Sequence, residues 1–159
     1  MSKAQHPSVP LRQRLREVGI QPSAPRLAIA SYVWNTTSHP TAEEVKEEVE
    51  KTFPTVSLAT VYNTLRLFVE KGLLREVQDY HTRAIRYDCN TKPHFHFVDS
   101  ETGEMLDLDP KMLRISPEMS VLGKEFQITE IEVTLHGRRL RKVKNGHRAR
   151  ADSESNEMN

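Results

Sequence analysis

The sequence predicts an α+β protein with two parts, a helical N-terminal half and a strand-rich C-terminal half. Apolar residues recur at helical spacing in four segments between residues 11 and 71. Two short strand-like segments, residues 73–77 and 84–88, follow and are joined by a polar turn. Helices followed by a two-stranded ribbon are typical of a winged helix-turn-helix domain. We therefore expect such a domain first and a small α/β domain after it.

The first two helices are bounded by clear terminal signals. Leu11 to Val18 has helical spacing, and Gly19 is a plausible C-terminal cap. A second helix should begin near Ser23–Pro25, because Ser caps helices and Pro is tolerated in the first turn. We expect this helix to break at His39–Pro40.

The third and fourth helices form the core of the expected DNA reader. The segment from Thr41 to Glu44 is a capping-box pattern. Ser57 should cap a fourth helix that runs from Leu58 to Lys71 and ends at Gly72. One face of this helix is apolar and carries Leu58, Val61, Leu65 and Phe68. Its polar face would suit the major groove of DNA, although any amphipathic helix has this pattern.

The second half has the alternation of strands. His94–Val98 and Glu104–Leu108 predict a hairpin through the turn Asp99–Gly103. We expect a short helix around Pro117–Lys124 and a third strand at Ile128–Leu135. Residues 137–159 are poor in apolar side chains, first basic and then acidic, which predicts a disordered tail.

The cysteine content and the distribution of apolar residues indicate the cellular compartment. The single cysteine, Cys89, excludes an intramolecular disulfide and a Cys-x-x-Cys zinc knuckle, and it suits a reducing compartment. No apolar run is long enough for a signal peptide or a membrane span. We therefore expect a cytoplasmic protein with no membrane partner.

Five residues could hold a metal ion: His39, Asp88, His94, His96 and Asp107. His-x-His on a strand places both imidazoles on one side, because side chains alternate. Taken alone, the pair is more often two surface histidines on a half-exposed strand than a metal site. Three imidazoles and two carboxylates without a thiolate suit Fe(II), Mn(II) or Zn(II). One ion bound by all five would join the two domains.

The nine residues from Ser57 to Leu65 closely resemble the recognition helix of the ferric uptake regulator (Fur) family. His39-Pro40-Thr41-Ala42 and Pro25-Arg26 also match, and the resemblance covers about residues 11–137. It implies that Tyr62 and Asn63 face the groove and that Thr60 and Arg26 lie near the DNA backbone.

The resemblance also implies the domain plan. Residues 1–88 would form the winged-helix DNA-binding domain, 89–93 a hinge, 94–136 the dimerisation domain and 137–159 the tail. The expected partners are a second copy of the chain and a palindromic double-stranded operator.

The five candidate ligands match the family's regulatory metal site, and three His with two Asp resemble its peroxide-sensing (PerR) branch. Asp at 107 fits that branch, whereas the iron-sensing branch typically has Glu. The resemblance implies one Fe(II) or Mn(II) per chain, with Zn(II) as an alternative in purified protein. It further implies a repressor that peroxide inactivates by Fe(II)-catalysed oxidation of His39 or His94.

The chain also departs from the family. The places of two zinc-binding Cys-x-x-Cys pairs hold Asp99, Thr102, Arg139 and Lys142. The places of a second metal site hold Pro93, Phe95, Arg114 and Arg138. We therefore expect no structural zinc and a dimerisation domain held together by packing alone.

Two other functions are compatible with parts of this pattern. An iron- or haem-responsive regulator of the same fold is the main alternative, although the haem branch typically has Cys-Pro where this chain has Cys89-Asn90. A metalloenzyme is a remote alternative, because five protein ligands leave little room for a substrate. We expect no enzyme activity.

Overall fold

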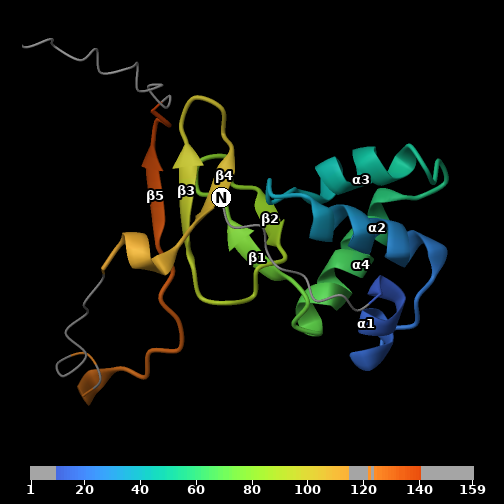
Figure 1. Ribbon diagram of the computed structural model, residues 1–159, viewed down its shortest axis with the longest axis horizontal. Helices are drawn as coiled ribbons and strands as arrows, with labels where there is room; N and C mark the ends of the chain where they lie inside the picture. Colours follow the sequence, from blue (N-terminus) through green and yellow to red (C-terminus); the bar gives the residue numbers. More distant parts are fainter. Residues whose placement is uncertain (1–9, 115–121, 123, 141–159) are drawn as a thin grey trace, which may run out of the picture.

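The computed structural model describes residues 10–114, 122 and 124–140. Four helices make up one side of the molecule, a three-stranded sheet makes up the other, and a two-stranded wing lies between them (Figure 1). The helices are α1 (Leu11–Glu17), α2 (Ala24–Asn35), α3 (Ala42–Glu50) and α4 (Leu58–Glu70). This is the predicted winged-helix order.

The helix ends follow the predicted capping signals. Gly19 has a φ of 78°, and the Ile20 amide donates to the Leu15 carbonyl, which closes the end of α1. The capping box at Thr41 and Glu44 has both of its hydrogen bonds. The Ser57 hydroxyl accepts from the Thr60 amide at the start of α4. The second helix ends at Asn35, before the expected break at His39–Pro40.

The buried faces of the four helices share one apolar core. Val61, Leu65 and Phe68 of α4 are fully buried in it, as the spacing predicted. Leu58, the fourth residue predicted on this apolar face, is 37% exposed. As the first residue of α4 it extends beyond the core.

The wing is an antiparallel pair of strands, β1 (Arg75–Gln78) and β2 (Ile85–Asp88). It packs against the C-terminal sheet, because Val77 of β1 forms a small apolar cluster with Val98 and Met105. Arg75 forms ion pairs with Glu130 and Glu132. The wing therefore contacts both halves of the molecule.

The C-terminal sheet has the order β4-β3-β5, with β3 (Phe95–Asp99) in the centre. The predicted hairpin of β3 and β4 (Met105–Leu108) is confirmed, and a short 3-10 helix, η1 (Pro110–Met112), follows it. The third strand, β5 (Thr134–Gly137), pairs parallel with β3 and begins later than the predicted 128–135 segment.

Most of the helix expected around Pro117–Lys124, and most of the predicted tail, lie outside the described residues. Among the described residues, no helix is long and apolar enough to cross a membrane.

Candidate metal centre

The five candidate ligands come from four different elements and meet at one place. His39 lies in the turn between α2 and α3, and Asp88 is the last residue of β2. His96 of β3 stands directly opposite Asp107 of β4, and His94 immediately precedes β3. One nitrogen or oxygen atom from each residue lies within 4.8 Å of all the others. The fold therefore brings together all five residues that the sequence singled out.

The separations between these atoms suit a bound ion. His39 Nε2 lies 2.7 Å from Asp107 Oδ1, and His94 Nε2 lies 3.1 Å from Asp88 Oδ2. His94 Nε2 and His96 Nε2 are only 2.8 Å apart. Ligand atoms about 2.1 Å from a common ion are spaced roughly 3 to 4 Å from one another. These three pairs lie at or just below that spacing, and other ligand pairs lie at 3.5 to 3.8 Å.

Hydrogen bonds on the outer ring nitrogens fix how two imidazoles face the centre. His39 Nδ1 lies 3.2 Å from the Met105 carbonyl oxygen, and His94 Nδ1 lies 2.7 Å from the Lys92 carbonyl oxygen. A carbonyl oxygen can only accept, so each Nδ1 carries the proton and donates it. In the neutral rings, the Nε2 lone pairs then point into the cluster, as metal-binding imidazoles require.

Two buried polar atoms in the cluster lack a hydrogen-bond partner, namely His39 Nε2 and Asp88 Oδ2. Both lie close to other ligand atoms, but neither contact has hydrogen-bond geometry. A buried polar atom without a partner is costly, and a divalent cation would satisfy both at once. The residues present therefore fit a metal ion.

The charges around the centre also favour a bound cation. Burial alone would lower the pKa of His94, but Asp107 and Asp88 outweigh it and raise the pKa to about 10. Burial alone would raise the pKa of Asp88, but the adjacent imidazoles of His94 and His96 lower it to about 2. The pKa of Asp107 is also lowered, since the adjacent imidazoles of His39 and His94 outweigh its burial. The two carboxylates thus stay ionised and attract a positive charge.

The main chain of His39 is held in an unusual conformation. Its φ is 48°, in the left-handed region that costs a non-glycine residue about 1 kcal/mol. The Arg86 guanidinium donates to the His39 carbonyl at 3.2 Å and to the buried Asp79 carboxylate at 3.1 Å. The Tyr87 amide donates to the Pro40 carbonyl. Strand β2 therefore holds the His39 turn in place beside Asp88.

Two neighbours of the centre were not assigned a role from the sequence. The Asn90 backbone amide donates to Asp88 Oδ1 at 2.7 Å, and its side-chain amide donates to Asp107 Oδ2 at 2.8 Å. Cys89 packs against the helical core, and burial raises its pKa to about 11, with Asp88 and Asp107 adding to the shift. Cys89 is therefore a protonated thiol at neutral pH. A single Asn between two strands carries no signal that sequence alone could have detected.

The far end of β3 corrects one expectation. The buried Asp99 carboxylate accepts from the amides of Glu101 and Thr102 in the hairpin turn and from the Arg139 amide beyond β5. Ser100 adds two hydrogen bonds to the Gly137 carbonyl. The C-terminal domain is thus not held by packing alone, because a carboxylate joins the segments at which the family's zinc cysteines would stand.

The predicted DNA-facing residues fall into two groups. Arg26, Thr60 and Asn63 line one groove of about 490 Å³ between the start of α2 and the start of α4. Tyr62 is 42% exposed and lies outside this groove. Its hydroxyl donates to the Glu43 carboxylate of α3 at 2.6 Å, which raises the pKa of Tyr62. All four residues are accessible to a partner at least in part.

Comparisons with known proteins agree with this architecture. A profile of the ferric uptake regulator family matches residues 17–136. The peroxide-responsive repressor PerR of Staphylococcus aureus is 31% identical over 123 residues, 77% of this chain and 82% of that protein. A zinc-bound manganese uptake regulator has a TM-score of 0.62 at 25% identity and matches 82% of this chain and 98% of its own. The Campylobacter jejuni peroxide stress regulator has a TM-score of 0.60 at 26% identity, covering 84% and 99%.

A winged-helix domain joined to an α/β dimerisation domain, with candidate metal ligands at the joint, defines a metal-responsive transcriptional regulator. The chain belongs to the ferric uptake regulator family. Members of this family are DNA-binding regulators that function as dimers.

Proposed function

We propose that the chain is a metal-dependent repressor that responds to peroxide and binds one Fe(II) or Mn(II) through His39, Asp88, His94, His96 and Asp107. The observation that carries this proposal is the convergence of three imidazole nitrogens and two carboxylate oxygens within 4.8 Å. Oxygen and nitrogen ligands suit these metals. Similarity to PerR of S. aureus and to the C. jejuni peroxide stress regulator supports the peroxide response.

The ligands divide between the two proposed domains. His39 and Asp88 belong to the DNA-binding domain, residues 1–88, whereas the other three belong to the dimerisation domain, residues 94–136. Metal binding would therefore favour the arrangement in which both domains pack together across the hinge at 89–93. Bound Fe(II) would supply the one electron that starts cleavage of the O–O bond, and overall one hydrogen peroxide would transfer one oxygen atom to an imidazole and leave as water. Addition of an oxygen atom to His39 or His94 would weaken that ligand and release the DNA-binding domain.

DNA recognition would use both groups of DNA-facing residues, those that line the groove and Tyr62 outside it. Arg26 and Thr60 would contact phosphates from the groove between α2 and α4, which gives affinity without sequence information. Asn63 and Tyr62 would reach base edges in the major groove from α4. Tyr62 would have to exchange its bond to Glu43 for a contact with DNA, or keep it and be oriented by it.

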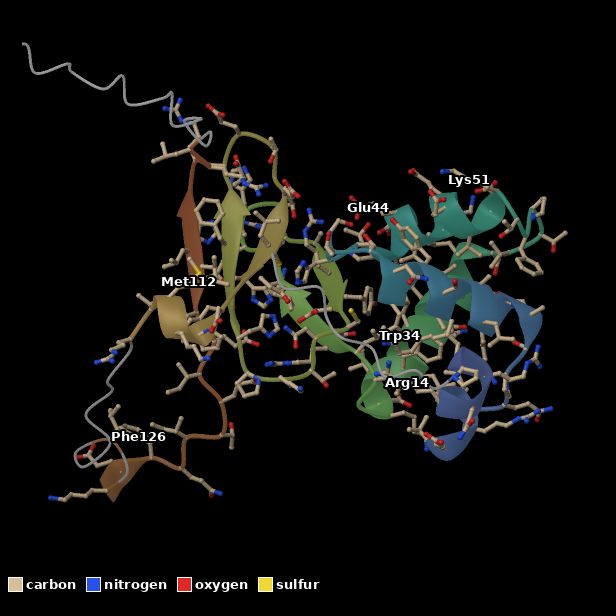
Figure 2. All side chains as sticks on the ribbon, viewed as in Figure 1. Arg14, Trp34, Glu44, Lys51, Met112 and Phe126 are labelled. Atoms are coloured by element: carbon tan, nitrogen blue, oxygen red, sulfur yellow. The ribbon has the colours of Figure 1, made fainter. Side chains whose placement is uncertain are left out.

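A homodimer through residues 94–136 would present two such readers to a palindromic operator in the cytoplasm. Large apolar side chains are exposed on this part of the chain, among them Met112 at 73% and Phe126 at 61% (Figure 2). A second copy would bury them. Sedimentation that gives only monomer, with and without Mn(II), would contradict the dimer.

A reversible metal-dependent repressor, responding to the level of the metal or of haem, is the alternative. The similarity to a manganese uptake regulator favours its metal-level form. In this case Fe(II) or Mn(II) would act as a corepressor, and peroxide would leave the histidines unchanged.

One experiment distinguishes the peroxide-responsive repressor from the reversible metal-dependent repressor. Operator DNA, enriched from a random pool by the Mn(II)-loaded protein, is footprinted with the Fe(II) and Mn(II) forms, each with and without peroxide. Mass spectrometry of the peptides that contain His39 and His94 follows. We expect loss of the footprint and one added oxygen on either histidine only in the Fe(II) form. No added oxygen with Fe(II), or the same yield with Mn(II), favours the corepressor.

A further inference from the structure

Asn90 contacts both carboxylates of the centre but is not itself a ligand. Its backbone amide donates to Asp88 Oδ1 and its side-chain amide to Asp107 Oδ2. The two contacts link the end of β2 to β4 across the hinge. In each carboxylate one oxygen accepts from Asn90, and the other makes the shortest contact with an imidazole, although Asp88 Oδ1 also lies 3.6 Å from His39 Nε2.

The oxygens that accept no bond from Asn90 make the shortest contacts with the imidazoles. Asp107 Oδ1 lies 2.7 Å from His39 Nε2 and 3.5 Å from His94 Nε2, and Asp88 Oδ2 lies 3.1 Å from His94 Nε2. A carboxylate offering one oxygen binds a metal through one bond, whereas a carboxylate free to rotate can bind through two. The choice between these modes fixes how many coordination positions the protein fills.

The side of the centre at Asp107 is also the side open to solvent. The Asp107 side chain is 34% exposed, whereas the side chains of the other four ligands are between 4% and 10% exposed. A small molecule that approaches the centre from solvent therefore meets Asp107 first. A rotation of this carboxylate would place its second oxygen where that molecule would enter.

We propose that Asn90 is a positioning residue that keeps Asp107 bound through one oxygen and so keeps a coordination position open to water or hydrogen peroxide. This inference rests on the proposed metal site. Without the Asn90 side chain, Asp107 Oδ2 loses its donor and turns toward the metal. The centre then still binds its ion, but the second Asp107 oxygen fills the coordination position that water or hydrogen peroxide would use.

The test compares Asn90→Ala with Asn35→Ala. Asn35 is the matched control, because its side-chain amide also donates a short hydrogen bond, at 2.7 Å to the Ser31 carbonyl oxygen in α2. Water-proton relaxivity of the Mn(II)-loaded protein reports exchangeable water on the metal, independently of any response to peroxide. Titration with Mn(II) alone gives the affinity, and oxidation of His39 and His94 is followed in the Fe(II) form.

For Asn90→Ala we expect the Mn(II) affinity to change less than about tenfold and the bound-water relaxivity to disappear, while histidine oxidation slows at least about tenfold. Asn35→Ala should match the wild type. Asn90→Gln, which keeps an amide at longer reach, should fall between the two and stands in for Asn90→Ala if that variant does not fold.

The outcomes separate the two proposals. Unchanged relaxivity and oxidation in Asn90→Ala overturn the role of Asn90 alone, as does complete loss of Mn(II) binding. A wild type with no exchangeable water also overturns it, but leaves the metal site standing. A wild type that binds no Mn(II) through these five residues overturns the proposed function itself. Bound water without histidine oxidation contradicts the peroxide response, and the relaxivity comparison still decides the role of Asn90.

Discussion

Two polar clusters lie at opposite ends of β3, and they differ in whether the protein can complete them alone. At the start of the strand, His94 and His96 meet three other side chains whose ligand atoms are mostly acceptors. At its end, the Asp99 carboxylate is surrounded by three backbone N–H donors. Acceptors facing one another need a cation, whereas an acceptor facing donors does not. A cluster of the first kind can respond to a metal, and one of the second kind is a permanent fastening.

The largest expected effect is that of removing a ligand from the first cluster. His96→Ala should lower the Mn(II) affinity more than about 100-fold and abolish metal-dependent DNA binding, because four ligands cannot replace the lost imidazole. The matched variant Tyr62→Ala should weaken DNA binding and leave the Mn(II) affinity within about twofold. Calorimetric titration and gel shifts measure both. If Tyr62→Ala abolished Mn(II) binding in folded protein, the separation of the two sites would be wrong.

A proton should compete with the metal at this cluster. Asp107 and Asp88 raise the pKa of His94 to about 10 against the effect of burial, so His94 is protonated at neutral pH when no metal is bound. Metal binding must release that proton, and the Mn(II) affinity should rise about tenfold per unit between about pH 6 and pH 8. Titrations in two buffers of different ionisation enthalpy count the protons. An affinity independent of pH would contradict this account.

Replacing Asp107 should have a smaller effect on affinity. Asp107→Glu keeps the charge, so we expect Mn(II) and DNA affinities within about threefold of the wild type. The longer side chain displaces the carboxylate from Asn90 and His39, so oxidation of His39 and His94 by peroxide in the Fe(II) form should slow markedly. Peptide mass spectrometry over time measures the rate. Oxidation at the wild-type rate would show that the position of this carboxylate is unimportant.

The smallest effect on the metal centre should come from the other end of β3. Asp99→Ala should lower the melting temperature equally with and without Mn(II), and change the Mn(II) affinity less than about twofold. Backbone donors from Glu101 and Arg139 lower the pKa of Asp99. Its stabilisation is therefore present above the unfolded pKa, near 3.8, and is lost as pH falls through the lower folded pKa.

The control for this prediction is Glu101→Ala in the same turn, which leaves all three Asp99 bonds in place and should change the melting temperature less. Elemental analysis of chelator-treated wild-type protein should find no stoichiometric zinc. Retained zinc would mean that the C-terminal domain is fastened by a metal after all.

Local sequence was enough for most of the secondary structure. Capping at Thr41 and Ser57 and the turn at Gly19 depend on neighbours within a few residues, so the local sequence is enough to predict them. The β3–β4 hairpin is equally local, and its register places His96 opposite Asp107. Strand β5 was placed too early, because its partner lies some 38 residues away in β3 and the alternation of residues 128–135 does not reveal the pairing.

The sequence alone limits the chemistry of the metal site, because the candidate ligands are three His and two Asp and the chain has a single thiol. How these side chains meet depends on tertiary packing. The bond from Arg86 to the His39 carbonyl and the bond from the Asn90 side chain to Asp107 both join residues distant along the chain. The bonds of Asp99 could not be predicted from local sequence either, because its third donor, Arg139, lies 40 residues away. Contacts of this kind depend on how the elements pack, and no local pattern records them.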